Sequence, residues 1–543
     1  MSTHNNSKRA IRLPLYIAIT LCVGVFIGAN MAGSSTAPTS NLMKSLTKFR
    51  QVLTHIENDY VDEVNSDDLV ESAITQMLEE LDPHTSYIPA KDLELISSRL
   101  EGNYEGIGVE FNIFKDTIHV VTPLSGGPSQ KLGIRSGDKI IKVDGKNVAG
   151  IGMTNLKVVE MLRGPGGSEV TVSIMREGED GLIDFIIERD VIPQYSVDVS
   201  YMVNDKIGYI KIARFANSTY LEFKEALLKL KDQGMEKLVI DLTGNPGGYL
   251  NRAVQIADEV LAGEQMIVYT DGKEKRYAEK HFSGEKGDFE SGSLVIMVDE
   301  GSASASEIVA GAVQDHDRGL IVGRRSFGKG LVQLPIDLND GSELRLTISR
   351  YYTPSGRSIQ KTYQGGKLDE YYEEAYQRYE NGEVYSADSI KFNDSLAFKT
   401  DKGRIVYGGG GITPDFFVPL DTTQNTRYIN RLFSTNSIQE YTVKYAQENR
   451  ARLADMGFDK FRASFKVTDE MLKDLVSVGE GNKLKFNEKE FRKSKQLLEQ
   501  LTKAYIARGI WDNDGFYPIF NQQDEIFQRA IQLMDEADKI AQR

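Results

Sequence analysis

The chain has 543 residues, of which 40% are hydrophobic and 27% charged, the composition of a folded protein with several domains. Its formal net charge of -14 argues against a nucleic-acid partner, which would require a basic stripe. A single cysteine, Cys22, excludes an internal disulfide and a thiolate metal cluster, and the six histidines form no zinc-binding pair. We therefore expect neither a metal nor a cofactor.

Residues 13–32 are nearly all apolar and are long enough to cross a bilayer as a helix. Basic residues precede this stretch and none follows until Lys44, so the positive-inside rule places residues 1–12 in the cytoplasm and the rest outside. A cleaved signal peptide is the alternative, but no good cleavage site follows Ala29. We expect an inner-membrane anchor and a periplasmic or otherwise extracytoplasmic body, joined by a linker over residues 33–44.

Residues 45–100 are predicted to be helical. Apolar side chains recur there at helical spacing, at Leu46, Phe49, Val52, Leu53 and Ile56. A second helix is expected over 67–81, ending before Asp82 and Pro83. We interpret this region as a helical lead-in that packs on the rest of the protein, rather than as the source of a catalytic histidine at His84.

Residues 101–190 are predicted to form a β-rich module. Its expected strands are 108–112, 117–122, 139–143 and 169–176, with short helices at 128–133 and 154–163. Near its start come Gly106, Ile107, Gly108 and Val109, where glycines let backbone N–H groups converge on an anion. This order resembles a bacterial PDZ domain. The resemblance implies that these four residues bind a peptide's terminal carboxylate while the peptide adds as a strand.

Residues 191–420 alternate between strand and helix patterns. Strands are expected at 208–214, 238–242 and 294–298, and helices at 218–233 and 251–261. This alternation is typical of parallel βα units with helices covering the sheet. Residues 421–543 are predicted to be a helical C-terminal region without a catalytic motif. Across 366–543 the expected helices are 371–380, 438–456, 488–508 and 524–542.

A run of small residues from Gly301 to Glu307 follows the buried strand 294–298 and opens a helix. The N-terminus of a helix favours developing negative charge, which suits a nucleophile at Ser304. Ser304 and Glu307 also have the spacing of a capping box, which requires no function.

Two later observations bear on this serine. Lys329 lies between glycines, and in a strand it would share one face with Leu331 and Gln333. A desolvated lysine loses its proton more readily and can then accept one from a serine hydroxyl, with Gln333 holding it in place. Earlier in the chain, Gly247 and Gly248 form a turn whose N–H groups can face an oxyanion. Considered alone, Lys329 would be interpreted as a charged surface residue, and the turn at Gly247 and Gly248 as an ordinary turn without a function.

Together these segments resemble the carboxyl-terminal processing, or tail-specific, serine protease family over about residues 45–420. The resemblance implies an α/β, crotonase-like protease core with an inserted β-rich PDZ domain and a helical C-terminal extension. It also implies Ser304 as nucleophile, Lys329 as general base and Gln333 as its support. The implied oxyanion donors are the backbone N–H groups of Ala305 and Gly247.

One position departs from the family pattern. Thr243 stands where the family usually has arginine, which puts a salt bridge beside the Gly247 turn in question. Arg163, at the end of the second helix of the PDZ-like module, is a candidate contact to the core that would gate the site.

The predicted function is that of a serine endopeptidase that cleaves envelope or exported proteins near their C-termini. Its partners would be protein substrates with free apolar C-terminal tails, and an adaptor protein or an oligomeric assembly is compatible with this function. A non-catalytic PDZ scaffold of the cell envelope is the main alternative. An acyl-CoA enzyme is disfavoured by export, and a Ser-His-Asp hydrolase by the lack of a G-x-S-x-G elbow.

Overall fold

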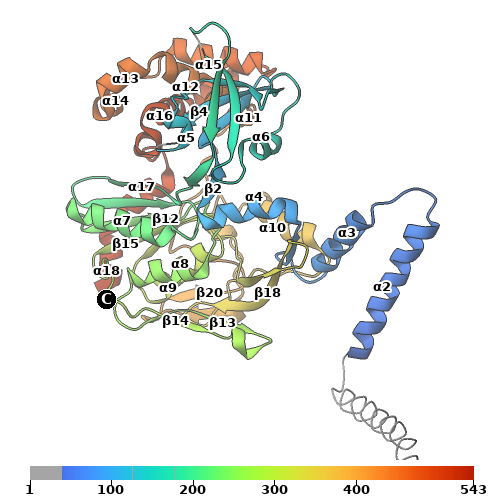
Figure 1. Ribbon diagram of the computed structural model, residues 1–543. Coiled ribbons are helices and arrows are strands. Elements are labelled where there is room, and N and C mark those ends of the chain that lie inside the picture. The colour runs from blue at the N-terminus through green and yellow to red at the C-terminus, as the bar shows by residue number, and fades with distance from the viewer. Residues whose placement is uncertain (1–38, 125, 177, 543) are drawn as a thin grey trace, which may run out of the picture. The chain divides into compact units, whose positions relative to one another are not determined.

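The computed structural model describes residues 39–124, 126–176 and 178–542 (Figure 1). The predicted membrane-spanning segment 13–32 and cytoplasmic segment 1–12 lie outside the described residues. Within the described part of the chain, no helix is long and apolar enough to cross a membrane. The chain divides into two compact units, residues up to 76 and residues from 77 onward, and each is described by itself.

The first unit contains α2 (Thr39–Asp59) and most of α3 (Ser66–Glu79). The helical spacing of the sequence is confirmed for both helices. α2 begins at Thr39, so its first turn falls within the predicted linker 33–44. Acidic residues occupy the first turn of α3, where they complement the helix dipole.

A six-stranded sheet forms the centre of the second unit. Its order is β10 (Val197–Met202), β11 (Ile207–Ile212), β12 (Lys237–Asp241), β15 (Ser293–Val298), β16 (Leu320–Gly323) and β21 (Phe416–Phe417). β10 is antiparallel to β11, and every other neighbouring pair is parallel. Every residue of β11 and β15 is buried, as expected for parallel strands with both faces covered.

Helices cover both faces of this sheet. One face packs against α7 (Thr219–Asp232), α8 (Leu250–Asp258) and α9 (Ala305–Asp315) (Figure 1). The other face packs against α17 (Glu525–Gln532) and α18 (Met534–Gln542). Residues 421–543 are therefore not one appended region, because their last two helices complete the layers of the core. The sequence could not predict this packing, because the amphipathic pattern of α17 and α18 indicates an apolar face but not the surface that this face covers.

A second, antiparallel sheet was not predicted. It runs β1 (Ser86–Ile88), β18 (Glu343–Tyr352), β13 (Met266–Gly272) and β14 (Lys280–Phe282), and β17 (Leu331–Asp337) also pairs with β18. The ladder between β17 and β18 shifts register between Val332 and Gln333. This sheet matters because β17 begins at Leu331, just after Lys329 and Gly330.

The β-rich module over residues 101–190 has its own core. The sheet order is β3 (Val109–Phe114), β4 (Thr117–Pro123), β5 (Lys139–Val143), β7 (Glu169–Met175) and β8 (Ile183–Glu188), with β6 (Lys146–Asn147) beside β5. Its helices are α5 (Pro128–Lys131) and α6 (Asn155–Leu162), and β2 (Asn103–Gly106) pairs with β9 (Asp190–Pro193). The four predicted strands are present as β3, β4, β5 and β7 and the two predicted helices as α5 and α6, and the structure adds β2, β6, β8 and β9.

The remaining helices of the second unit include α4 (Ala90–Glu101), which precedes β2, and α10 (Leu368–Glu380), which follows β18. Beyond them are α11 (Arg427–Ser434), α12 (Ser437–Glu448), α13 (Arg450–Met456), α14 (Phe458–Ser464), α15 (Asp469–Gly481) and α16 (Glu488–Phe520). The helix predicted over 438–456 is split at Asn449, whose backbone is non-helical. α16 continues past its predicted end at 508 and kinks at Trp511 and Asp512. A hairpin of β19 (Ala397–Lys399) and β20 (Ile405–Tyr407) precedes this part of the chain.

Candidate active site

Ser304 lies in the turn between β15 and α9, with φ 55° and ψ −114°. This backbone region is sparsely populated, costs about 1–3 kcal/mol for a non-glycine residue and is found chiefly at functional sites. The neighbouring serines hold the turn in place. Ser302 Oγ donates to the carbonyl of Leu242 at 2.8 Å, and Ser306 Oγ donates to the carbonyl of Asn245 at 3.0 Å.

Glu307 connects the serine turn to the lysine loop. Its buried Oε2 accepts hydrogen bonds from the N–H groups of Ser304, at 2.8 Å, and Lys329, at 2.9 Å. Oε1 accepts from Ser326 Oγ and from the N–H of Gly328. Burial raises the pKa of Glu307 to about 7, although these donors act against the rise. The capping-box interpretation identified the first bond but missed the other three.

Tyr351 on β18 makes a second connection between the same two segments. Its buried hydroxyl lies 3.0 Å from the carbonyl oxygen of Ser304 and 2.6 Å from that of Lys329. Because Ser304 and Lys329 both donate to one oxygen of Glu307, their backbone nitrogens lie no farther apart than those two bonds laid end to end. Nothing in the sequence marked Tyr351, because β18 was not predicted.

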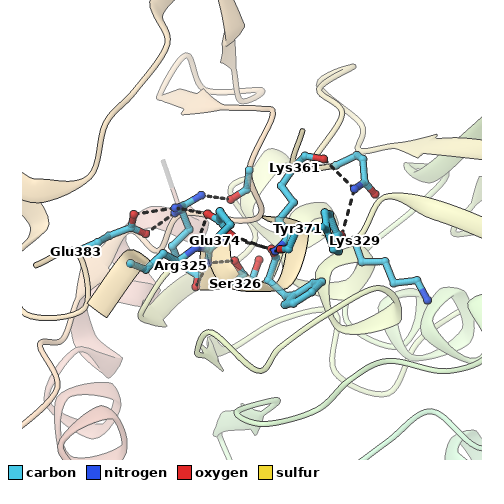
Figure 2. A network of polar contacts seen from close by, with 12 residues as sticks. Arg325, Ser326, Lys329, Lys361, Tyr371, Glu374 and Glu383 are labelled. Atoms are coloured by element: carbon cyan, nitrogen blue, oxygen red, sulfur yellow. Dashed lines mark hydrogen bonds and ion pairs between the residues drawn. The ribbon is translucent and has the colours of Figure 1, made fainter. Parts of the chain in front are cut away.

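Lys329 is partly buried. Burial lowers the pKa of its ammonium group, the carboxylates of Asp82 and Glu307 oppose this change, and Arg345 adds to it. Figure 2 shows the ammonium extending away from the polar network around Glu374. Among the contacts of the described residues, no hydrogen bond joins Ser304 Oγ to Lys329 Nζ.

The loop that carries Lys329 is fixed by α10 and the residues around it (Figure 2). Arg378 donates to the carbonyls of Ser326, at 2.8 Å, and Phe327, at 3.2 Å. The Lys361 ammonium lies 4.2 Å from the centre of the Phe327 ring and 4.1 Å from that of Tyr371. Charge-assisted hydrogen bonds and cation–π contacts of this kind are strong when buried, so they stabilise the loop at Ser326 and Phe327, just before Lys329.

Gln333 is not on a strand face shared with Lys329, so that part of the sequence interpretation is wrong. β17 begins only at Leu331, and the bulge after Val332 interrupts the alternation of side chains. Gln333 Nε2 instead donates to Thr347 Oγ1 at 3.3 Å.

The two predicted oxyanion donors lie beside the serine. A Cβ on Gly247 would approach Ser304 Cβ to 2.7 Å and the nitrogen of Ala305 to 2.9 Å. The N–H of Gly247 is bonded to Asn245 Oδ1 at 2.8 Å. The N–H of Ala305 is in the first turn of α9, where backbone donors have no partner within the helix.

The family usually has an arginine at position 243, beside the Gly247 turn, and here a lysine from another strand lies next to Thr243. Lys211 on β11 donates to Asp241 Oδ1 at 3.0 Å and to Thr243 Oγ1 at 2.8 Å. A positive charge is therefore present next to Thr243, although residue 243 does not supply it.

The loop of Gly106, Ile107, Gly108 and Val109 connects β2 to β3. Ser129 donates to the carbonyl of Ile107, and the N–H of Leu124 donates to that of Gly108. In a trans peptide the C=O and the following N–H point in opposite directions, so the N–H groups of Gly108 and Val109 face away from these bonds. β3 is one of the two edge strands of its sheet, and β8 is the other.

Arg163, at the end of α6, contacts α4 and β2. Its Nη1 donates to Ser98 Oγ at 2.9 Å, and its guanidinium lies 4.4 Å from the centre of the Tyr104 ring.

Comparison with known proteins identifies the family. Residues 206–371 match the model of peptidase family S41, 119–176 match a PDZ domain, 27–92 match the N-terminal domain of the activating protease CtpB, and 428–512 match a family of unknown function. A carboxy-terminal-processing protease of Bartonella bacilliformis is 37% identical over 352 residues, which cover 63% of this chain and 80% of that protein. The chain belongs to the S41 family of carboxy-terminal-processing serine proteases.

Two further relatives of this S41 peptidase show similar coverage. A probable CtpA-like serine protease of Staphylococcus aureus is 34% identical and covers 63% of this chain and 67% of that protein. The solved structure of a photosystem II D1 C-terminal processing protease is 30% identical, with a TM-score of 0.33, over 57% of this chain and 83% of that one. The span matched to the peptidase family contains Ser304, Glu307, Lys329 and Tyr351.

Proposed function

We propose that this S41 peptidase is an endopeptidase in which Ser304 is the nucleophile and Lys329 the general base. The observation that supports it most strongly is the pair of buried groups, Glu307 and Tyr351, that each hydrogen-bond both residues' backbones. Burial of the Lys329 ammonium favours its neutral form, which a general base requires.

In the proposed reaction, Ser304 is acylated and the acyl-enzyme is then hydrolysed. Ser304 Oγ attacks the scissile carbonyl carbon while neutral Lys329 takes the hydroxyl proton. The Ala305 N–H donates to the oxyanion, joined by that of Gly247 if it leaves Asn245 Oδ1. Collapse of the intermediate breaks the C–N bond, and the Lys329 ammonium returns its proton to the leaving amine. Water attacks the acyl-enzyme with Lys329 again as base. The ester bond to Ser304 Oγ then breaks, Lys329 returns its proton to that oxygen, and the carboxyl product leaves. Gln333, whose Nε2 donates to Thr347 Oγ1, is retained in this proposal as the residue that supports the lysine.

We assign tail capture to the PDZ domain. The outward N–H groups of Gly108 and Val109 would bind a terminal carboxylate, and the free edge of β3 would pair with the preceding residues as an added strand. Removing residues 102–190 should abolish the preference for substrates with a free apolar tail while leaving Ser304 reactive. A truncated enzyme with unchanged tail preference would contradict this role.

For Arg163 the proposed gating contact runs to α4, the helix that precedes the PDZ domain, through Ser98. Arg163→Ala should therefore change the ratio of cleavage rates for tailed and tailless substrates. Its free energy of unfolding should change little. The proposal would be refuted if wild type and Arg163→Ala had the same ratio of cleavage rates for tailed and tailless substrates. It would also be refuted if both proteins cleaved the two substrates equally.

The layered core, with α9 opening at the nucleophile, supports assignment to the crotonase-like folds. We further place the protease in the cell envelope, anchored through residues 13–32 with its body outside the cytoplasm. Protease treatment of intact spheroplasts should digest the body of the chain, whereas full protection would contradict this topology.

Point variants separate this function from a non-catalytic PDZ scaffold. Ser304→Ala should lose proteolysis and retain tail binding. Lys329→Arg should be equally inactive, because a guanidinium does not deprotonate in proteins. Both variants are measured by cleavage of a tail-bearing protein and by binding of a fluorescent peptide with a free C-terminus. Full function in either variant would refute the proposed dyad.

A further inference from the structure

A tight turn of the N-terminal segment, Asp82 to Thr85, lies between α3 and β1. The Asp82 carboxylate, only 6% exposed, accepts four hydrogen bonds. The donors are the N–H groups of His84 and Thr85, at 2.8 and 2.9 Å, Thr85 Oγ1 at 2.5 Å, and Thr347 Oγ1 at 3.1 Å. A carboxylate surrounded by donors in this way has a fixed position and acts only as an acceptor.

This turn is joined to the strands next to Lys329. The N–H of Thr347 on β18 donates to Thr85 Oγ1 at 3.1 Å, and β1 pairs with β18 immediately beyond. Thr347 Oγ1 also accepts from Gln333 on β17. A continuous chain of hydrogen bonds thus runs from Asp82 through Thr347 to Gln333, on the strand that follows the lysine loop.

The charged groups that face Lys329 come from three elements. They are Asp82 in the turn, Glu307 on α9 and Arg345 on β18, and Asp82 acts on the ammonium more strongly than the other two. His84 of the same turn faces Lys329 as well. Burial first, and then the charge of Lys329, lower the pKa of His84 to about 3, so it is neutral in the working range, with Nε2 bonded to Tyr371 Oη at 2.9 Å.

We propose that Asp82 is a positioning residue for Lys329, placed so that its carboxylate stabilises the ammonium that forms when the lysine takes the proton of Ser304. The inference rests on the proposed function, which makes Lys329 the base. An ammonium in a desolvated site needs a fixed opposite charge, and four donors keep the Asp82 carboxylate from moving as the proton is transferred. The turn from Asp82 to Thr85 would then supply part of the active site, whereas the sequence predicts only that residues 45–100 pack on the rest of the protein.

The test measures the titration of Lys329 directly. Wild type and Asp82→Asn are labelled with acetic anhydride at a series of pH values, and mass spectrometry gives the extent of acetylation at each lysine. The negative charge favours the ammonium, so its removal should lower the midpoint for Lys329 by about one pH unit or more. Lys361 should titrate as in wild type. The acid limb of kcat/KM should move in the same direction, and kcat should fall about tenfold or more.

Asp340→Asn is the matched control, because Asp340 lies in the turn between β17 and β18 and bonds only to Ser342 among the contacts described. It should leave the Lys329 midpoint unchanged. An unchanged midpoint in Asp82→Asn would overturn the inference even if activity fell, since that result indicates a purely structural role. If Asp82→Asn shows no thermal transition, Thr347→Val decides: a lowered Lys329 midpoint supports the inference, and an unchanged midpoint overturns it.

Failure of this inference is distinguishable from failure of the proposed function. Acetylation of Lys329 does not depend on Ser304, so the midpoint shift is measurable even in Ser304→Ala. Normal proteolysis by Lys329→Arg would refute the dyad itself, whereas an inactive Lys329→Arg with an unshifted Asp82→Asn midpoint would refute only the role of Asp82.

Discussion

At the scale of single residues, Glu307 has the most demanding environment in the site. Its carboxylate accepts from four donors in two loops while fully buried. Glutamine would place an N–H₂ group opposite backbone N–H donors, so at least one charge-assisted bond is lost, worth about 1.5–3 kcal/mol. Glu307→Gln should therefore lower kcat roughly tenfold to a hundredfold, measured with a tail-bearing peptide substrate. Unchanged kcat would show that the bridge is not needed for catalysis.

The same residue predicts a pH dependence of stability. Its folded-state pKa of about 7 lies above the ordinary 4.5, so the folded protein binds this proton more tightly than the unfolded chain. The resulting stabilisation is complete below pH 4.5 and is lost as the pH rises through about 7, with a total on the order of 3 kcal/mol. Urea unfolding between pH 5 and 8 should show a steeper decline for wild type than for Glu307→Gln. Parallel declines would contradict this assignment.

At the scale of elements, the serine turn depends on close approach of the backbone at Gly247. Gly247→Ala would place a Cβ 2.7 Å from Ser304 Cβ, at a residue with φ +97°. Because a displacement of about 1 Å in an active site costs about a hundredfold in rate, we expect at least that loss of kcat. Gly263→Ala is the control, since Gly263 also has positive φ but no atom within 4 Å. Equal activity of the two variants would contradict the steric argument.

The sequence predicts the individual helices and strands of this site better than it predicts the contacts between them. Ser304 and Lys329 could be predicted because their two motifs occur together at this separation, and the strand and helix around Ser304 follow from their apolar patterns. Tyr351 and Asp82 could not be found in this way, because pairing of β18 with β1, β13 and β17 is set by long-range contacts. The prediction that Gln333 shares a strand face with Lys329 is wrong for a related reason. A bulge after Val332 changes the alternation of side chains, and no local residue pattern indicates it.

At the scale of the whole molecule, the C-terminal helices α17 and α18 are part of the protease core. Phe527 is 4% exposed and packs edge-on against Tyr209, with ring centres 5.3 Å apart. Phe527→Ala should destabilise the core by about 3–5 kcal/mol, the usual cost of such a truncation. Leu221→Ala, at a residue on α7 that is 70% exposed, should change the free energy of unfolding by less than about 0.5 kcal/mol. Urea unfolding that does not distinguish the two variants would show that these helices are an appendage after all.

The most direct measurement for the whole account is covalent labelling of the nucleophile with a fluorophosphonate, followed by mass spectrometry of the modified peptide. The adduct should lie on Ser304, and its rate of formation should rise with pH through a single titration below the ordinary lysine pKa of about 10.5. Lys329→Met should slow labelling by about a hundredfold or more, since a general base contributes at least that much. An adduct on another residue, or equal rates in wild type and Lys329→Met, would contradict the pairing of Ser304 with Lys329.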